Sequence, residues 1–211
     1  MFHSSINQAA VSAYTRLQTQ CYHFHVSRAG YVLVGGRSSR MGRDKALLPY
    51  RGGPLVESVV RAVELAAGSA TLVGHPRRYR DLGFPVLPDA YPGEGPLGGI
   101  LTALRHASPD WNLVVACDMP GLTADFLRAL LEAAERTDAR ALAPAGPSGR
   151  PEPLCAVYHR GALPALEAAF SGGARKASAA LEAVGAAVLP IQEIAYFQNV
   201  NTPEEWVLHV S

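Results

Sequence analysis

A loop rich in glycine and arginine has the residue types of a phosphate-binding site. It reads GGRSSRMGRDKA over residues 35–46 and follows the apolar run YVLV. The glycines Gly35 and Gly36 let backbone N–H groups approach a ligand closely. We expect two of its cations, Arg40 and Lys45, to act in catalysis as well as in binding. Four basic side chains would surround the phosphates: Arg37, Arg40, Arg43 and Lys45.

Lys45 is unusual because the chain uses arginine for almost every other positive charge. It contains 17 arginines and only two lysines, Lys45 and Lys176. A compact ammonium fits where a planar guanidinium is too bulky, so a lysine in this loop indicates a specific contact. The loop is not a P-loop, because Lys45 stands three residues after Gly42 and precedes an alanine. The glycine spacing does not match a dinucleotide-binding fingerprint either.

A second candidate is Asp118, which ends the apolar segment NLVVACD and precedes the turn MPG. A carboxylate at the carboxyl end of a strand is a suitable ligand for Mg²⁺ that bridges phosphate oxygens. Alternatively, Asp118 could cap the helix that begins near Thr123, but Thr123 is the better cap for that helix. We therefore expect Asp118 to bind Mg²⁺.

A third candidate is Asp89, at the start of the loop DAYPGEGPLGG. Residues 93–98 match G-x-G-x-x-G, but Pro92 and Pro96 break the strand–turn–helix geometry that a dinucleotide site requires. The carboxylate of Asp89 could accept hydrogen bonds from a base or a ribose. It could equally cap the local backbone, and the sequence leaves both roles open.

Strand-like and helix-like segments alternate from Tyr31 onward. Strands are expected at 31–35, 70–74, 84–88, 112–118, 139–145 and 154–160. Helices are expected at 54–68, 97–107, 123–137 and 162–170. This alternation predicts an α/β fold with a doubly wound, mainly parallel sheet and helices on both faces. Ligands bind beyond the carboxyl ends of such strands, where the three candidate loops would meet.

Composition restricts the class of protein. The 211 residues are 48% hydrophobic, which suits one soluble globular domain with a substantial core. A net charge of +1 gives no basic field for nucleic acid, and no apolar run approaches the ~20 residues that cross a membrane. The three cysteines form neither a disulfide framework nor a zinc pattern, which predicts a cytoplasmic protein. They are Cys21, Cys117 and Cys155.

Six segments, in this order, resemble the molybdenum cofactor guanylyltransferase family. They are LVGGRSSRMGRDKALL, GGPLVESVV, PDAYPGEGPLGGI, VVACDMPGL, RPEPLCAVYH and NVNTPEEW. The first is specific to a small group of nucleotidyltransferases. The chain departs from the family pattern at three places: Val34, where the family usually has alanine; Gly74, where it often has asparagine; and Ala116, where it usually has proline.

The resemblance implies a Rossmann-like nucleotidyltransferase domain over residues 30–211, preceded by a poorly ordered extension over 1–29. It implies Mg²⁺-dependent transfer of GMP from GTP to the phosphate of molybdopterin, with release of pyrophosphate. Molybdoenzymes or their chaperones would receive the product. In that family's pattern, Lys45 would bind phosphates, Asp118 would hold Mg²⁺, and Asn201 would be a further polar ligand. The remaining nucleotide contacts would come from Leu33, Val34, Gly35, Gly36, Gly74 and Asp89.

Two alternatives remain open. One is a cytidylyltransferase for the same cofactor, or another sugar- or alcohol-phosphate nucleotidyltransferase, although the pair Gly35-Gly36 favours GTP. The other is a non-catalytic nucleotide-binding regulator, which should have lost Lys45 or Asp118, and both are present. The basic segment HPRRYR at 75–80 is expected to be a solvated surface, with docking of the anionic pterin as the alternative.

Overall fold

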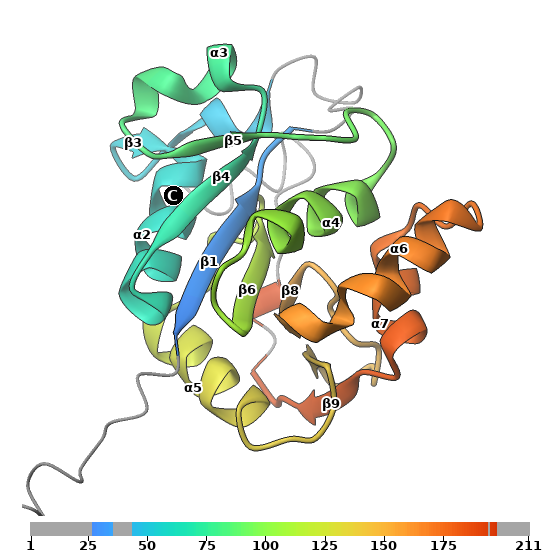
Figure 1. Cartoon of the computed structure of the whole chain (residues 1–211). Helices are drawn as coiled ribbons and strands as arrows, with labels where there is room; N and C mark the ends of the chain where they lie inside the picture. The colour runs from blue at the N-terminus through green and yellow to red at the C-terminus, as the bar shows by residue number, and fades with distance from the viewer. Residues whose placement is uncertain (1–26, 36–43, 194, 198–211) are drawn as a thin grey trace, which may run out of the picture.

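A seven-stranded sheet separates two layers of helices in the computed structural model (Figure 1). The structure describes residues 27–35, 44–193 and 195–197. The strand order is β5-β4-β1-β6-β8-β7-β9. Only β8 runs antiparallel to its neighbours in this sheet. The strands are β1 (Arg28–Leu33), β4 (Ala70–Gly74), β5 (Val86–Pro88), β6 (Trp111–Ala116), β7 (Ala141–Ala145), β8 (Cys155–His159) and β9 (Ala187–Pro190).

Helices cover both faces of the sheet (Figure 1). One face carries α2 (Leu55–Ala67) and α5 (Ala124–Ala134). The other carries α4 (Pro96–His106), α6 (Leu163–Ser171) and α7 (Ala177–Val184). Within the described residues, no helix has the length and apolar character that a membrane span requires. The smaller elements are η1 (Lys45–Leu47), β2 (Pro49–Tyr50), β3 (Gly53–Pro54), α3 (Pro76–Tyr79), η2 (Arg80–Leu82), η3 (Arg160–Ala162) and η4 (Ala195–Phe197).

The central strands are apolar on both sides because both faces of the sheet are covered. In β1, Val32 packs in the core on the α2 and α5 side, whereas Tyr31 packs in the core on the α4 side. In β6, Val115 packs in the core on the α2 and α5 side, and Val114 packs in the core on the α4 side. This alternation follows from the two-residue period of a strand. The predicted doubly wound, mainly parallel α/β fold is confirmed.

Local signals fix the helix ends. The side chain of Thr123 accepts a hydrogen bond from the backbone N–H of Phe126, so the predicted cap of α5 is confirmed. Helix α4 begins with Pro96, whose missing N–H is not needed at a helix start. Helix α2 ends at Gly68, which has a φ of 80° in the left-handed region that favours glycine.

Three of the longer elements differ most from the sequence prediction, and the short elements β2, β3 and α3 were not predicted either. Strand β1 begins at Arg28 rather than at Tyr31, so it includes the end of the segment assigned to the extension. Helix α7 was not predicted, because its alanine-rich sequence has few large apolar side chains to mark a buried face. Edge strand β9 was not predicted either, since it is only four residues long.

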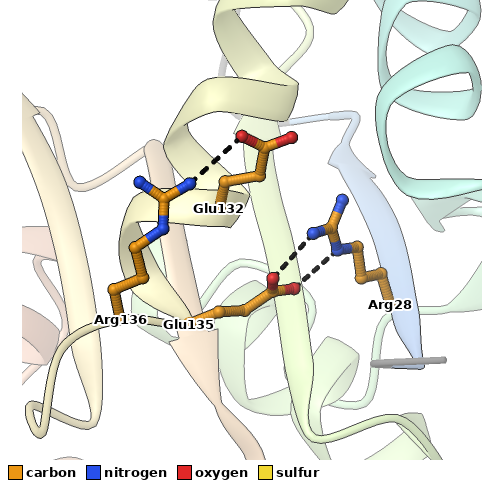
Figure 2. A network of polar contacts seen from close by, with 4 residues as sticks. All are labelled: Arg28, Glu132, Glu135 and Arg136. Carbon is orange, nitrogen blue, oxygen red and sulfur yellow. Dashed lines mark hydrogen bonds and ion pairs between the residues drawn. The ribbon is translucent and has the colours of Figure 1, made fainter. Parts of the chain in front are cut away.

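An ion pair ties the start of β1 to the end of α5 (Figure 2). The guanidinium of Arg28 donates two hydrogen bonds to the carboxylate of Glu135, at 2.6 and 2.7 Å. Both side chains are largely buried, and the bond to Glu135 raises the pKa of Arg28. The neighbouring pair between Arg136 and Glu132 is longer, at 3.4 Å, and Arg136 is 75% exposed.

The two pairs in Figure 2 give a matched test of what holds β1 in place. We expect Arg28→Ala to lower the free energy of unfolding by about 1–3 kcal/mol, because it leaves the largely buried carboxylate of Glu135 unpaired. Arg136→Ala should change it by less than about 0.5 kcal/mol, since exposed pairs contribute little. Urea denaturation measures both. Equal losses for the two variants would contradict this assignment.

Candidate active site

Three parallel strands end side by side at one edge of the sheet. Leu33 at the end of β1 is paired with Val73 of β4 on one side and with Ala116 of β6 on the other. The ladder continues past the strand ends, because the N–H of Val34 donates to the carbonyl of Val73 and the N–H of Cys117 donates to that of Leu33. The segments that follow the three strands therefore leave the sheet at the same level.

Lys45 and Asp118 meet at this edge. The ammonium Nζ of Lys45 lies 3.6 Å from the carboxylate Oδ2 of Asp118, and both side chains are about four-fifths buried. Asp118 lies two residues after the end of β6, whereas Lys45 is the first residue of η1 after the glycine- and arginine-rich loop. The structure thus brings together the two residues on which the sequence argument depended most.

The environment of Asp118 favours a cation. Burial raises the pKa of the Asp118 carboxyl, and the nearby ammonium of Lys45 only partly opposes this effect. The negative charge of the ionised Asp118 carboxylate is thus only partly compensated by Lys45. An additional cation nearby would stabilise the ionised form.

The donor set fits a magnesium ion that is shared with a substrate. Within the ranges that the structure describes, no group of three or more histidine, cysteine, aspartate or glutamate side chains could enclose a metal. Mg²⁺ usually binds through one or two carboxylates, with water and substrate phosphates completing its shell. The single, largely buried carboxylate of Asp118 beside the ammonium of Lys45 is compatible with this requirement.

Asp44 anchors the turn that carries Lys45. Its Oδ1 accepts a hydrogen bond from the N–H of Ala46, and its Oδ2 accepts one from the hydroxyl of Tyr79 at 2.6 Å. Arg78 adds a weaker contact at 3.4 Å. The segment 75–80 is therefore not only the solvated surface that the sequence predicted, because Tyr79 is buried and contacts the loop.

Gly74, at the end of β4, has no room for a side chain. A Cβ atom there would lie 2.6 Å from Cγ2 of Val34 and 2.7 Å from its carbonyl oxygen. The valine at 34 and the glycine at 74 are thus in direct contact, so these two departures from the family pattern lie at one place. Gly74 can meet a ligand only through its backbone.

Asp89 has a local structural role. Its Oδ1 accepts hydrogen bonds from the N–H of Tyr91 and the hydroxyl of Thr102, and its own N–H donates to the carbonyl of Gly74. The capping role that the sequence left open is thus present, whereas contact with a nucleotide remains a prediction. Thr102, a buried polar residue of α4, was missed because nothing in the helix pattern marks it.

The remaining predicted residues divide into two groups. Leu33 packs its side chain against Gly99 of α4, and Gly35 has a φ of 98° that favours glycine at this turn. Five predicted residues lie outside the described part of the chain: Gly36, Arg37, Arg40, Arg43 and Asn201.

The two cysteines within the described residues are not placed for nucleophilic chemistry. Cys117 and Cys155 are buried free thiols, and burial raises the pKa of both. A thiol is a weak nucleophile in this state because the reactive form is the thiolate. Cys155 has no exposed surface and belongs to the core.

Residues 30–187 match the family of MobA-like NTP transferase domains. A probable molybdenum cofactor guanylyltransferase of Deinococcus radiodurans is 36% identical over 82% of this chain and 89% of its own length. A molybdenum cofactor guanylyltransferase of Cupriavidus metallidurans is 32% identical over 86% of this chain and 94% of its own. Among solved structures, molybdopterin-guanine dinucleotide biosynthesis protein A from Archaeoglobus fulgidus superposes with a TM-score of 0.74. It is 29% identical and covers 86% of this chain and 96% of its own.

The contact between positions 34 and 74 can be tested by a double substitution. We expect Gly74→Ala to lower the free energy of unfolding by about 1–3 kcal/mol, because the added methyl group overlaps Val34. Adding Val34→Ala should recover part of the loss by removing Cγ2, although the carbonyl of Val34 still restricts the site. Denaturation of the two single variants and the double variant measures this coupling. Strictly additive effects would argue against it.

Asp118 should lower the stability of the fold at neutral pH. Because its pKa is raised in the folded protein, its contribution to stability is fully present below the ordinary aspartate pKa and is lost as the pH rises through the raised value. Asp118→Asn removes the charge at similar shape, so we expect an equal or higher melting temperature at neutral pH without metal or nucleotide. Scanning calorimetry decides this. A clearly lower melting temperature would show that the pair with Lys45 is mainly structural.

Proposed function

Since the chain belongs to the MobA-like NTP transferase family, we propose that it transfers GMP from GTP to the phosphate of molybdopterin. The products are pyrophosphate and the guanine dinucleotide form of the molybdenum cofactor. The observation that carries this proposal is the meeting of Lys45 and Asp118, 3.6 Å apart, beyond the carboxyl ends of parallel strands. Open α/β sheets bind nucleotides at this edge.

The reaction requires little proton chemistry from the protein. An oxygen of the molybdopterin phosphate forms a bond to the α-phosphorus of GTP, and the bond from that phosphorus to the bridging oxygen breaks. The electron pair leaves with pyrophosphate. Because the attacking oxygen is already anionic, the protein acts mainly by aligning the groups and neutralising their charge.

Lys45 and Asp118 divide these tasks. Lys45 binds the phosphates of GTP, and the short turn of η1 directs its ammonium to the edge where β1 and β6 end. Asp118 is the residue that would hold Mg²⁺. When bound, the ion would neutralise phosphate oxygens and make the α-phosphorus a better electrophile. Gly36 and Arg40 are proposed as further phosphate ligands from the residue types of the loop, and Asn201 as a polar ligand near the metal from the resemblance alone.

The nucleoside is proposed to lie on the β4 side of the edge. Support comes from Gly35, whose left-handed backbone turns the chain there, and from Gly74, which presents only backbone. Asp89 is held beside Gly74 by a hydrogen bond to its carbonyl oxygen. One carboxylate oxygen of Asp89 is bonded within the protein, and we assign the nucleotide contact to the other.

We place the protein in the cytoplasm, with molybdoenzymes or their chaperones as recipients of the product. The two buried free cysteines of the described segments suit a reducing compartment. We name molybdoenzymes or their chaperones as recipients because the proposed product is a form of the molybdenum cofactor.

A nucleotide panel tests the proposed function. With Mg²⁺ present, calorimetric titration should give an affinity for GTP at least about tenfold higher than for CTP, ATP or UTP, since a wrong base leaves buried polar groups unpaired. Pyrophosphate release should depend on molybdopterin, and Asp118→Asn should reduce its turnover number by about 100-fold or more.

The rival functions give different results in the same panel. Equal affinity for GTP and CTP would contradict a guanylyltransferase and favour a less selective or cytidylyl-transferring enzyme. Tight GTP binding without transfer to molybdopterin would indicate the non-catalytic regulator. The Asp118→Asn variant should keep the wild-type circular dichroism spectrum, so that its loss of turnover is not a loss of fold.

A further inference from the structure

Tyr79 is a buried tyrosine that the proposed reaction does not use. It ends the short helix α3, and 1% of its surface is exposed. Its neighbours Arg77, Arg78 and Arg80 are exposed, so Tyr79 alone of these four points into the protein. It belongs to the core on the α2 and α5 side of the sheet.

The hydroxyl of Tyr79 reaches the turn that carries Lys45. It donates a 2.6 Å hydrogen bond to Oδ2 of Asp44, whose other oxygen accepts from the N–H of Ala46. Asp44 thereby caps η1, and its carbonyl accepts from the N–H of Leu47 to close the turn. Since Lys45 is the first residue of this turn, fixing Asp44 also fixes the backbone from which the ammonium extends.

Tyr79 also lies against the other two segments of the site. Its ring carbon Cε2 would be 3.1 Å from a Cβ atom on Gly74, and its hydroxyl oxygen would be 3.7 Å from one on Gly35. One side chain therefore lies next to the turn after β1 and the end of β4, and it is hydrogen-bonded to Asp44, which caps η1. These segments carry the base side and the phosphate side of the proposed nucleotide site.

The phenol remains a donor over the working range of pH. Burial and the bond to the Asp44 carboxylate both raise the pKa of Tyr79. The hydrogen of the hydroxyl is therefore retained. Arg78 also contacts Asp44, but it is 55% exposed and its bond is long, so it is a weaker anchor.

We propose that Tyr79 is a positioning residue for nucleotide binding: through Asp44 it holds Lys45 at the distance from Gly35 and Gly74 that a bound nucleoside triphosphate requires. The inference rests on the proposed function only in needing Lys45 to bind phosphates. It does not depend on which base is preferred or on molybdopterin as the acceptor.

Tyr79→Phe removes the hydroxyl and keeps the ring. We expect the affinity for the Mg²⁺ complex of the best-bound nucleotide to fall about tenfold, which corresponds to losing one hydrogen bond to a charged group. The KM for that nucleotide should rise by a similar factor. An unchanged affinity would overturn the proposal.

Tyr158→Phe is the matched control. Tyr158 is fully buried in the opposite core, and its hydroxyl donates a 2.9 Å hydrogen bond to the carbonyl of Pro153. The two variants should lose similar amounts of thermal stability, whereas only Tyr79→Phe should weaken nucleotide binding. Equal weakening in both variants would show a general effect of destabilisation and would overturn the proposal.

A double-substitution cycle with Lys45→Ala tests whether Tyr79 affects nucleotide binding through Lys45. If Tyr79 acts through Lys45, Tyr79→Phe should change the affinity of the Lys45→Ala protein by less than about twofold. A full tenfold loss in that background would overturn the proposed route.

Asp44→Ser tests the same contact from the other side, in case Tyr79→Phe folds poorly. Serine can still cap η1 but offers no second oxygen to Tyr79. It should reproduce the tenfold loss, and wild-type affinity would contradict the inference.

Discussion

The parallel pairing of β1 with β4 on one side and β6 on the other is the constraint on which the site depends. It brings three strand ends to the same edge of the sheet, so that residues distant in sequence become neighbours. Asp118 needs only to follow β6 to lie beside Lys45. Tyr79 meets the same edge because α3 follows β4 after a single residue. The chemistry of the site is therefore largely decided by strand register.

Much of this could be predicted from local sequence, because strand ends, caps and turns have local causes. Thr123 was identified as a cap and Asp118 as a site residue from their positions relative to one apolar segment. Tyr79 and the pair of Arg28 with Glu135 could not be found in this way, since each depends on a partner at least 35 residues away. The structural role of Asp89 was one of two possibilities until the contact with Thr102 was known.

In the protein without a ligand, the negative charge of Asp118 is not fully compensated. Asp118 is held where its carboxylate is poorly solvated, and Lys45 compensates it only in part. Under the proposed function, a cation and a polyphosphate would together complete this site, and the free protein would be less stable than with a neutral residue there. A lysine suits this position because its ammonium has no fixed planar geometry. It could move its contact from the Asp118 carboxylate to a phosphate, whereas an arginine would have to realign the plane of its guanidinium.

The contact between Val34 and Gly74 makes the residue that is tolerated at one position depend on the residue at the other. A Cβ atom at 74 would overlap both Cγ2 and the carbonyl oxygen of Val34, so a side chain at 74 requires a smaller residue at 34 together with a shift of the backbone. The two positions are therefore expected to be epistatic: a side chain that a related backbone accepts at 74 would not be accepted here without a change at 34.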